Sequence, residues 1–255
     1  MNGDVMKPTL NSIASAILLI LSNLAAAGNV TVSAAASLTN AFKDLAQSFE
    51  GQHPGTKVLL NVGASGALLQ QIAKGAPVDV FASADQETMD QAFKQGLIVA
   101  NSRHNFVRNA LVLIVPFDSK LAIKRLRDLS QSRIDKVAIG KPASVPVGRY
   151  TQAALETANL WSVIRAKAIN TQNVRQSLDY VARGEVEAGF VYATDAAVMP
   201  DKVKVAFTVP LNSAISYPIA ASTSSSNAKE AKSFIEYVLS PAGQTILGKY
   251  GFLKP

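Results

Sequence analysis

The chain contains no cysteine and only two histidines, so several kinds of chemistry are excluded at the start. Without cysteine there is no disulfide framework, no cysteine-ligated zinc site, no iron–sulfur cluster and no thiol nucleophile. His53 and His104 lie about fifty residues apart, which is not the spacing of metal ligands. We therefore expect no cofactor and no metal cation held directly by side chains.

Charged residues and long apolar runs are also scarce. Asp, Glu, Lys and Arg make up 17% of the 255 residues, and 25 Lys and Arg against 18 Asp and Glu give a net charge of +7. This excess raises the question of a nucleic-acid or anionic membrane partner. Nucleic-acid interfaces cluster Lys and Arg with aromatic residues, whereas the one dense basic stretch, 120–127, is predicted to be the solvated face of a short helix. We expect no nucleic-acid partner.

Residues 1–27 differ from the rest of the chain. Lys7 precedes an apolar run from Ile13 to Leu21, and Ala25-Ala26-Ala27 follows with small residues. This pattern predicts a secretory signal peptide that is cleaved near Ala27, so the mature protein is expected in the periplasm. The run is short for a membrane span, but Asp4 beside Lys7 keeps an uncleaved anchor open as the alternative.

The remaining residues alternate between strand and helix patterns. A β-branched or apolar run followed by a helical period occurs three times in succession, which predicts a parallel sheet covered by helices on both faces. The predicted strands are 30–34, 58–62, 78–82, 111–115, 137–139, 188–192 and 203–207. The predicted helices include 85–95, 149–157, 174–183, 229–239 and 242–250. We expect an α/β fold with two lobes, the first formed by 28–110 plus 218–255 and the second by 111–217.

Small residues gather where predicted strands of the first lobe lead into helices. Ser37 follows the strand at 30–34, and Ser65 lies in the Gly63-Ala64-Ser65-Gly66 turn after the next strand. This edge of an open α/β sheet is where ligands bind, and the free N–H groups of a starting helix attract anions. Taken singly, each serine is better explained by helix capping, and only the two together on adjacent units favour a shared ligand site. The glycine turn lacks the Gly-Lys-Ser/Thr of a nucleotide-binding loop.

Three groups of the second lobe fall at the same kind of junction. Pro146 has no N–H, so the first free donor of its helix belongs to Val147, and Val174 begins the next helix. Tyr192 ends the strand 188–192 and carries a hydroxyl donor. The alternative for the valines is ordinary packing, and for Tyr192 a core position with its hydroxyl in water.

At these junctions the residues match a known family. The segments AAASL (34–38), GAPVDVFASA (75–84) and GFVYATDA (189–196), with Tyr250-Gly251-Phe252 near the end, resemble the periplasmic molybdate-binding proteins of ABC transporters. The resemblance covers essentially all of the chain after residue 27. It implies a two-lobed type II periplasmic binding protein fold that closes on molybdate or tungstate, a membrane permease as partner, no enzymatic activity and a monomer.

The resemblance also assigns the ligand-binding residues. In the first lobe they are Ser37 and Ser65, through hydroxyl and backbone N–H, and in the second lobe the N–H groups of Val147 and Val174 and the hydroxyl of Tyr192. Molybdenum would thus be held as an oxyanion. A shell of neutral donors disfavours a protonated oxyanion, whose own O–H would lack an acceptor.

Two other functions remain open at this point. Sulfate has the shape and charge of molybdate at a smaller size, so a receptor for another tetrahedral oxyanion is the first alternative. An exported hydrolase that uses Ser37 or Ser65 is the second, although neither histidine lies where it would serve as a base. Asp79 and Asp195 are expected to make buried structural hydrogen bonds, and Arg149 to be a solvated helix residue or a source of positive potential.

Overall fold

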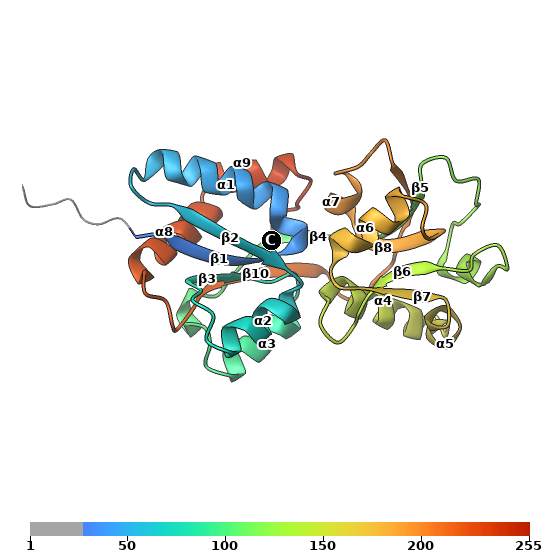
Figure 1. Ribbon diagram of the computed structural model, residues 1–255, viewed down its shortest axis with the longest axis horizontal. Coiled ribbons are helices and arrows are strands. Elements are labelled where there is room, and N and C mark those ends of the chain that lie inside the picture. The colour runs from blue at the N-terminus through green and yellow to red at the C-terminus, as the bar shows by residue number, and fades with distance from the viewer. Residues whose placement is uncertain (1–27) are drawn as a thin grey trace, which may run out of the picture.

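The computed structural model of the protein describes residues 28–255, and the predicted signal peptide at 1–27 lies outside them. The described residues form two five-stranded sheets, each covered by helices on both faces (Figure 1). Each sheet with its helices is one lobe of the molecule. The predicted two-lobed α/β architecture is therefore present.

The first sheet has the strand order β2-β1-β3-β10-β4. Strands β1, β2 and β3 are parallel, and β10 runs antiparallel to both β3 and β4. The strands are β1 (Val30–Ala35), β2 (Val58–Gly63), β3 (Val80–Ala82), β4 (His104–Asn109) and β10 (Ile215–Ala221). Helices α1 and α9 lie over one face of this sheet and α2 and α3 over the other (Figure 1).

The helices of the first lobe come from both ends of the described chain. They are α1 (Thr39–Gln52), α2 (Ser65–Ala73), α3 (Gln86–Lys94), α8 (Ala228–Leu239) and α9 (Pro241–Lys249), with short 3-10 helices at Ala36–Leu38 and Ala100–Ser102. In α1, Phe42, Leu45 and Phe49 recur at helical spacing and are buried, whereas Lys43 and Asp44 are exposed. Burial of each large apolar side chain contributes about 1.5–3 kcal/mol, which holds α1 against the sheet.

The second sheet has the strand order β7-β6-β8-β5-β9. Here β6 is parallel to β7 and β8, and β5 is antiparallel to β8 and β9. The strands are β5 (Leu111–Pro116), β6 (Val137–Gly140), β7 (Ala168–Thr171), β8 (Ala188–Tyr192) and β9 (Val203–Thr208). The helices are α4 (Pro146–Thr157), α5 (Trp161–Arg165), α6 (Val174–Ala182) and α7 (Ala193–Ala196), with a 3-10 helix at Leu126–Ser130.

Most elements of the second lobe follow the sequence pattern. The continuous apolar run of β5 is buried from Leu111 to Val115, as a strand covered on both faces requires. Helix α4 begins at Pro146, three residues before the predicted start, because proline suits the first helical position. The predicted helix at 120–127 is wrong, since regular structure begins only at Leu126.

Strands β4, β7 and β10 and the short helices α5 and α7 were not predicted. Strand β10 spans Ile215–Ala221, so the predicted lobe boundary at 217/218 falls inside a strand of the first sheet. The other predicted boundary, at 110/111, falls between β4 and β5, which belong to different sheets. The division of the chain into lobes at these residue numbers stays a prediction.

Two further properties hold for the part of the chain that the structure describes. Within residues 28–255, no helix combines the length and apolar character needed to cross a membrane. Over the same residues, no three or more metal-ligating side chains of the His, Asp and Glu types gather where they would hold a metal ion.

Helix α4 is pressed against the end of β6 at Gly148, which gives a test of the packing. A Cβ atom at position 148 would lie 1.8 Å from the carbonyl oxygen of Gly140. Gly148→Ala is therefore expected to lower the free energy of unfolding by about 3 kcal/mol, as overpacking does. Gly51→Ala is the control, because a Cβ there meets nothing within 4 Å and alanine favours the helix by roughly 0.5 kcal/mol. Equal midpoints of urea unfolding for the two variants would contradict this packing.

Candidate functional site

A small cavity lies between the lobes, close to the carboxyl ends of parallel strands. Residues of both lobes line it, and all of them are uncharged. They are Ala36, Ser37, Gly63, Ala64, Val145, Pro146, Val147, Asn173, Val174 and Tyr192. The cavity volume is about 10 Å³, close to the smallest space that holds one water molecule.

The beginnings of two second-lobe helices supply backbone donors to this cavity. Val145 and Asn173 are the residues that precede α4 and α6, and neither the N–H of Val147 nor that of Val174 bonds to any other part of residues 28–255. The first N–H groups of a helix have no partner within it, and the helix dipole adds positive potential there. Both valines are buried, so these donors are shielded from water.

Tyr192 has a buried hydroxyl donor that lacks a partner within the described residues. Its side chain is 1% exposed at the end of β8, and its hydroxyl has no hydrogen-bond partner among the described residues. An unpaired buried polar group costs about 1–3 kcal/mol, so this hydroxyl calls for a partner that the protein itself does not provide. Burial raises the pKa of Tyr192 well above its ordinary value, which keeps the hydroxyl protonated as a donor.

The two serines of the first lobe lie differently from each other. Ser37 lines the cavity from the 3-10 helix Ala36–Leu38, and its Oγ lies 3.0 Å from the hydroxyl oxygen of Tyr217. Ser65 is the first residue of α2, directly beside the cavity-lining Ala64, and its Oγ accepts a bond of 3.0 Å from the N–H of Ala84. Neither side chain caps its helix, so the capping alternative is wrong for both.

Of the five predicted site residues, the structure thus brings four to the cavity: Ser37, Val147, Val174 and Tyr192. Ser65 is fully buried and adjoins the cavity-lining Ala64. Its hydroxyl oxygen accepts from the N–H of Ala84, so the hydroxyl proton remains available as a donor. The assignment of these five residues as ligands stays a prediction.

Arg149 joins the lobes, a role that was not predicted from the sequence. Its Nε donates to Asp85 Oδ2 at 2.9 Å and its Nη2 to Thr88 Oγ1 at 2.7 Å, both in the first lobe. The expectation of a solvated helix residue is wrong, because the Arg149 side chain is only 17% exposed. No sequence signal near position 149 would have identified the partner, 64 residues away.

Arg175 makes the second set of contacts between the lobes. It donates from Nη1 to Asn40 Oδ1 at 2.9 Å, and its Nε lies 2.6 Å from Asp195 Oδ1 within its own lobe. A backbone bond of 3.0 Å from Gly66 N–H to the carbonyl of Ser144 also joins the two lobes.

The two carboxylates that the sequence suggested are structural, as predicted. Asp79 accepts from the N–H of Thr31 at 2.8 Å and from Ser225 Oγ at 2.7 Å, which ties the start of α8 to the first sheet. Asp195 is completely buried against Arg175. Burial raises the pKa of Asp195 to about 6, although the Arg175 guanidinium opposes this rise.

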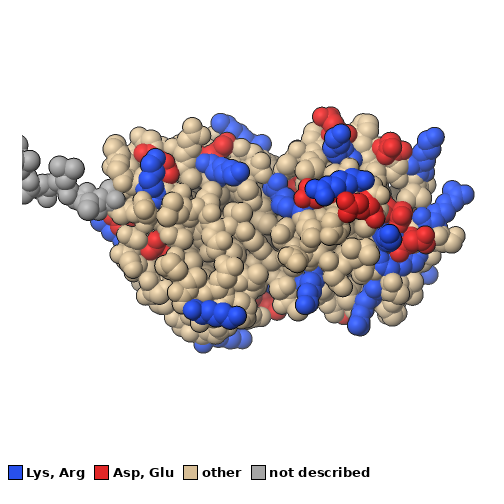
Figure 2. All heavy atoms as spheres, in the orientation of Figure 1, with Lys and Arg blue, Asp and Glu red and all other residues tan. Residues whose placement is uncertain are grey.

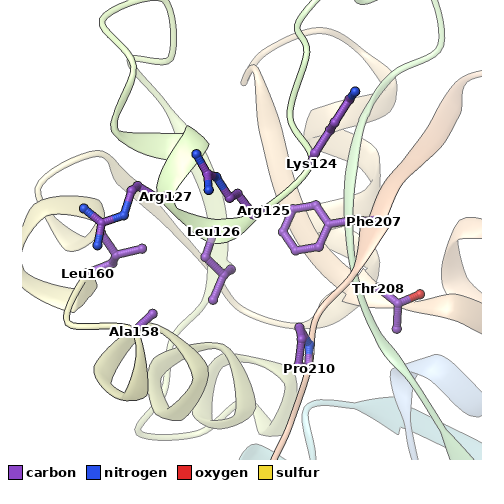
Figure 3. A pocket seen from close by; sticks show the side chains of 9 residues that line it. All are labelled: Lys124, Arg125, Leu126, Arg127, Ala158, Leu160, Phe207, Thr208 and Pro210. Carbon is purple, nitrogen blue, oxygen red and sulfur yellow. The ribbon is translucent and has the colours of Figure 1, made fainter.

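A larger hollow on the second lobe differs in character from the cavity. It has a volume of about 460 Å³ and is lined by Lys124, Arg125 and Arg127 together with Phe207 (Figure 3). The Arg125 side chain is 75% exposed and pairs with Asp128, and exposed ion pairs of this kind contribute little. Elsewhere on the face in Figure 2, Lys and Arg lie on both lobes with Asp and Glu among them. On that face, basic and acidic side chains are therefore mixed.

Comparisons with known proteins agree with this architecture. The model of the bacterial extracellular solute-binding protein family matches residues 30–253. The molybdate-binding protein ModA from Escherichia coli is 37% identical over 240 residues, covering 90% of each chain. A proposed substrate-binding lipoprotein of an ABC transporter from Bacillus subtilis is 36% identical over 225 residues, covering 88% of this chain and 85% of the relative.

A solved structure supports the same fold. The substrate-binding domain of a proposed molybdenum ABC transporter from Clostridium difficile superposes with a TM-score of 0.68 at 35% identity, covering 90% of this chain and all of that one. The two-lobed fold expected from the sequence resemblance is thereby confirmed.

The raised pKa of Asp195 gives a test of stability against pH. The folded state binds this proton more tightly than the unfolded chain, because the pKa is about 6 in the fold against 3.8 for the free side chain. The stabilising contribution is complete below pH 3.8 and is lost as the pH rises through about 6. From pH 4 to pH 7, the unfolding free energy of the native protein should therefore fall relative to that of Asp195→Asn.

Urea unfolding at several pH values measures this difference, with Asp201→Asn at an exposed position of the same lobe as control. A difference between native protein and Asp195→Asn that is independent of pH would show that Asp195 stays ionised in the fold.

Proposed function

The chain belongs to the bacterial extracellular solute-binding protein family, and we propose that it binds molybdate or tungstate between its lobes. The bound ion is delivered to the membrane permease of an ABC importer. Export by the signal peptide at 1–27, a periplasmic location and a monomeric state are parts of the same proposal.

One observation carries the choice of ligand: the cavity offers buried donors that have no acceptor in the protein. The unpartnered hydroxyl of Tyr192 and the N–H groups of Val147 and Val174 come from three separate elements. A fully ionised tetrahedral oxyanion is the complementary ligand, because each of its oxygens accepts hydrogen bonds and none donates. The relatives named for molybdate binding support the same ligand.

The absence of charge among the lining residues fits this proposal. A lysine or arginine in the cavity would itself have to be desolvated, at a cost that often exceeds the attraction it provides. Arg175, the cation beside Ser37, is neutralised by Asp195. Dipoles therefore hold the ion, while the diffuse net charge of +7 attracts anions from a distance.

Hydrolysis at Ser37 or Ser65 lacks support from the local contacts. Ser37 Oγ meets the Tyr217 hydroxyl, and Ser65 Oγ accepts from a backbone N–H, so neither contact provides a base that would remove the serine proton. Sulfate remains the competing ligand, because it has the same shape and charge. The order of affinities of molybdate, tungstate and sulfate, measured by competition calorimetry, decides between them.

The hydroxyl of Tyr192 gives the direct test. Tyr192→Phe is expected to weaken molybdate binding roughly ten- to hundredfold, since a hydrogen bond to a charged group contributes about 1.5–3 kcal/mol. The thermal stability of the ligand-free protein should not fall, because the hydroxyl has no partner to lose. Isothermal titration calorimetry measures the affinity.

Tyr180→Phe is the matched control, because the Tyr180 hydroxyl contacts only Gln176 on α6 within the described residues. Unchanged molybdate affinity in Tyr192→Phe would remove Tyr192 from the site, and absence of binding by the native protein would overturn the proposed ligand.

Gly66 tests whether closure of the lobes contributes to affinity. A Cβ at this position would lie 2.7 Å from the carbonyl oxygen of Ser144 in the other lobe. Gly66→Ala is therefore expected to weaken molybdate binding roughly tenfold, because overpacking at this contact keeps the lobes from meeting as closely. Gly248→Ala in α9 is the control, because a Cβ there meets nothing within 4 Å. Native-like affinity in Gly66→Ala would mean that the ion binds without this contact.

A further inference from the structure

A chain of hydrogen bonds connects the cavity to the segments that join the lobes. Ser37 Oγ lies 3.0 Å from Tyr217 Oη, and Asn109 Nδ2 donates to the same Tyr217 oxygen at 3.3 Å. Asn109 Nδ2 also donates to Thr194 Oγ1 in the second lobe at 2.9 Å. Asn109 ends β4 directly before β5, and Tyr217 lies in β10 just after the return from the second lobe.

The Asn109 amide fixes which groups donate and which accept in this series of hydrogen bonds. Its Oδ1 accepts from the backbone N–H of Ala110 at 2.9 Å. A backbone N–H is always a donor, so the oxygen of the amide must face it and the NH₂ group must face the two hydroxyls. Those hydroxyls, of Tyr217 and Thr194, suit this arrangement because a hydroxyl accepts as readily as it donates.

The hydrogen bond from Asn109 in turn fixes the donor role of the Tyr217 hydroxyl. The Tyr217 side chain is fully buried, and its oxygen already accepts from Asn109. Among the described residues, the acceptor that contacts the Tyr217 hydroxyl is Ser37 Oγ. If Ser37 instead donated to Tyr217, the phenolic proton would be left buried without a partner, which is unfavourable. Tyr217 therefore donates to Ser37.

We propose that Asn109 and Tyr217 are positioning residues that orient the Ser37 hydroxyl, so that its proton points into the cavity and bonds to the oxyanion. Since Ser37 Oγ accepts from Tyr217, its own proton is free for an oxygen of the ligand. The inference rests on the proposed function and adds to it: the polarity of one ligand-binding group is set by residues that do not line the cavity.

The orientation has a chemical consequence for the ligand. A hydroxyl held as a donor matches a fully deprotonated oxyanion, such as molybdate, tungstate or sulfate. An anion that keeps an acidic proton, such as hydrogen phosphate, would bring that proton into a cavity where the nearby hydroxyls and N–H groups are already donors.

A double-mutant cycle tests the proposal. Molybdate affinity is measured by calorimetry for the native protein, Tyr217→Phe, Ser37→Ala and the double variant. We expect Tyr217→Phe to weaken binding roughly three- to tenfold in the native background, because Ser37 is no longer held as a donor. In the Ser37→Ala background, the same change should alter affinity less than twofold, because the hydroxyl that Tyr217 orients is gone.

A purely structural role of Tyr217 would weaken binding by the same factor in both backgrounds, and that result would overturn the proposal. No loss of affinity in Tyr217→Phe or in Ser37→Ala would overturn it as well. Tyr237→Phe is the matched control, because this tyrosine is also buried in the first lobe but donates to Ser48, outside the cavity lining. Binding of molybdate by the native protein in the same series shows that the proposed function stands whatever the cycle returns.

Asn109→Asp is a second variant, and it should reverse which groups donate and which accept in these hydrogen bonds. A carboxylate accepts the Tyr217 proton, so Tyr217 then accepts from Ser37, and Ser37 turns a lone pair to the cavity. The loss of affinity caused by Asn109→Asp should be at least threefold larger with Tyr217 present than in the Tyr217→Phe background. Equal losses of affinity in both backgrounds would show that the added charge acts without Tyr217. That result would contradict the proposed orientation of Ser37 through Tyr217.

Discussion

Buried donors without acceptors are the constraint on which the rest of this molecule depends. The cavity is built where helix beginnings and the end of β8 meet, and the protein leaves the Tyr192 hydroxyl without a partner there. Such groups are unfavourable in the fold by themselves, and they are satisfied when an acceptor from outside binds. These donors lie together because of how the two lobes meet. The segments that join the lobes and the contacts of Arg149 and Arg175 hold the lobes in this arrangement.

Electrical neutrality around the cavity follows from the same constraint. Each arginine that joins the lobes is matched by a carboxylate, Arg149 by Asp85 and Arg175 by Asp195. A strong unbalanced charge would bind anions of many kinds, whereas directed dipoles select by shape and by protonation state. Under the proposed function, the surface charge would attract the anion at long range and the dipoles would recognise it at short range.

Much of the fold could be predicted from periodicity and from turn residues. The glycines at 75, 96 and 184 that end helices all have positive φ angles, and four of the five predicted site residues line the cavity. Strand β10 escaped prediction because Tyr217 and Pro218 were interpreted as a lobe boundary. The partners that Arg149, Arg175 and Asn109 have in the other lobe lie 61 to 138 residues away in the sequence. Such contacts depend on how the lobes meet, which no local pattern encodes.

The backbone donors at Val147 and Val174 have a consequence for how this site changes over evolution. Any residue except proline carries an N–H, so the side chains at these two positions are free to vary with the packing around them. Gly148 has no such freedom, since a Cβ atom there would lie 1.8 Å from the carbonyl oxygen of Gly140. Under the proposed function, the path of the main chain would therefore place these two ligand donors, and a neighbour that holds this path, such as Gly148, would mark the site as well as the valines do.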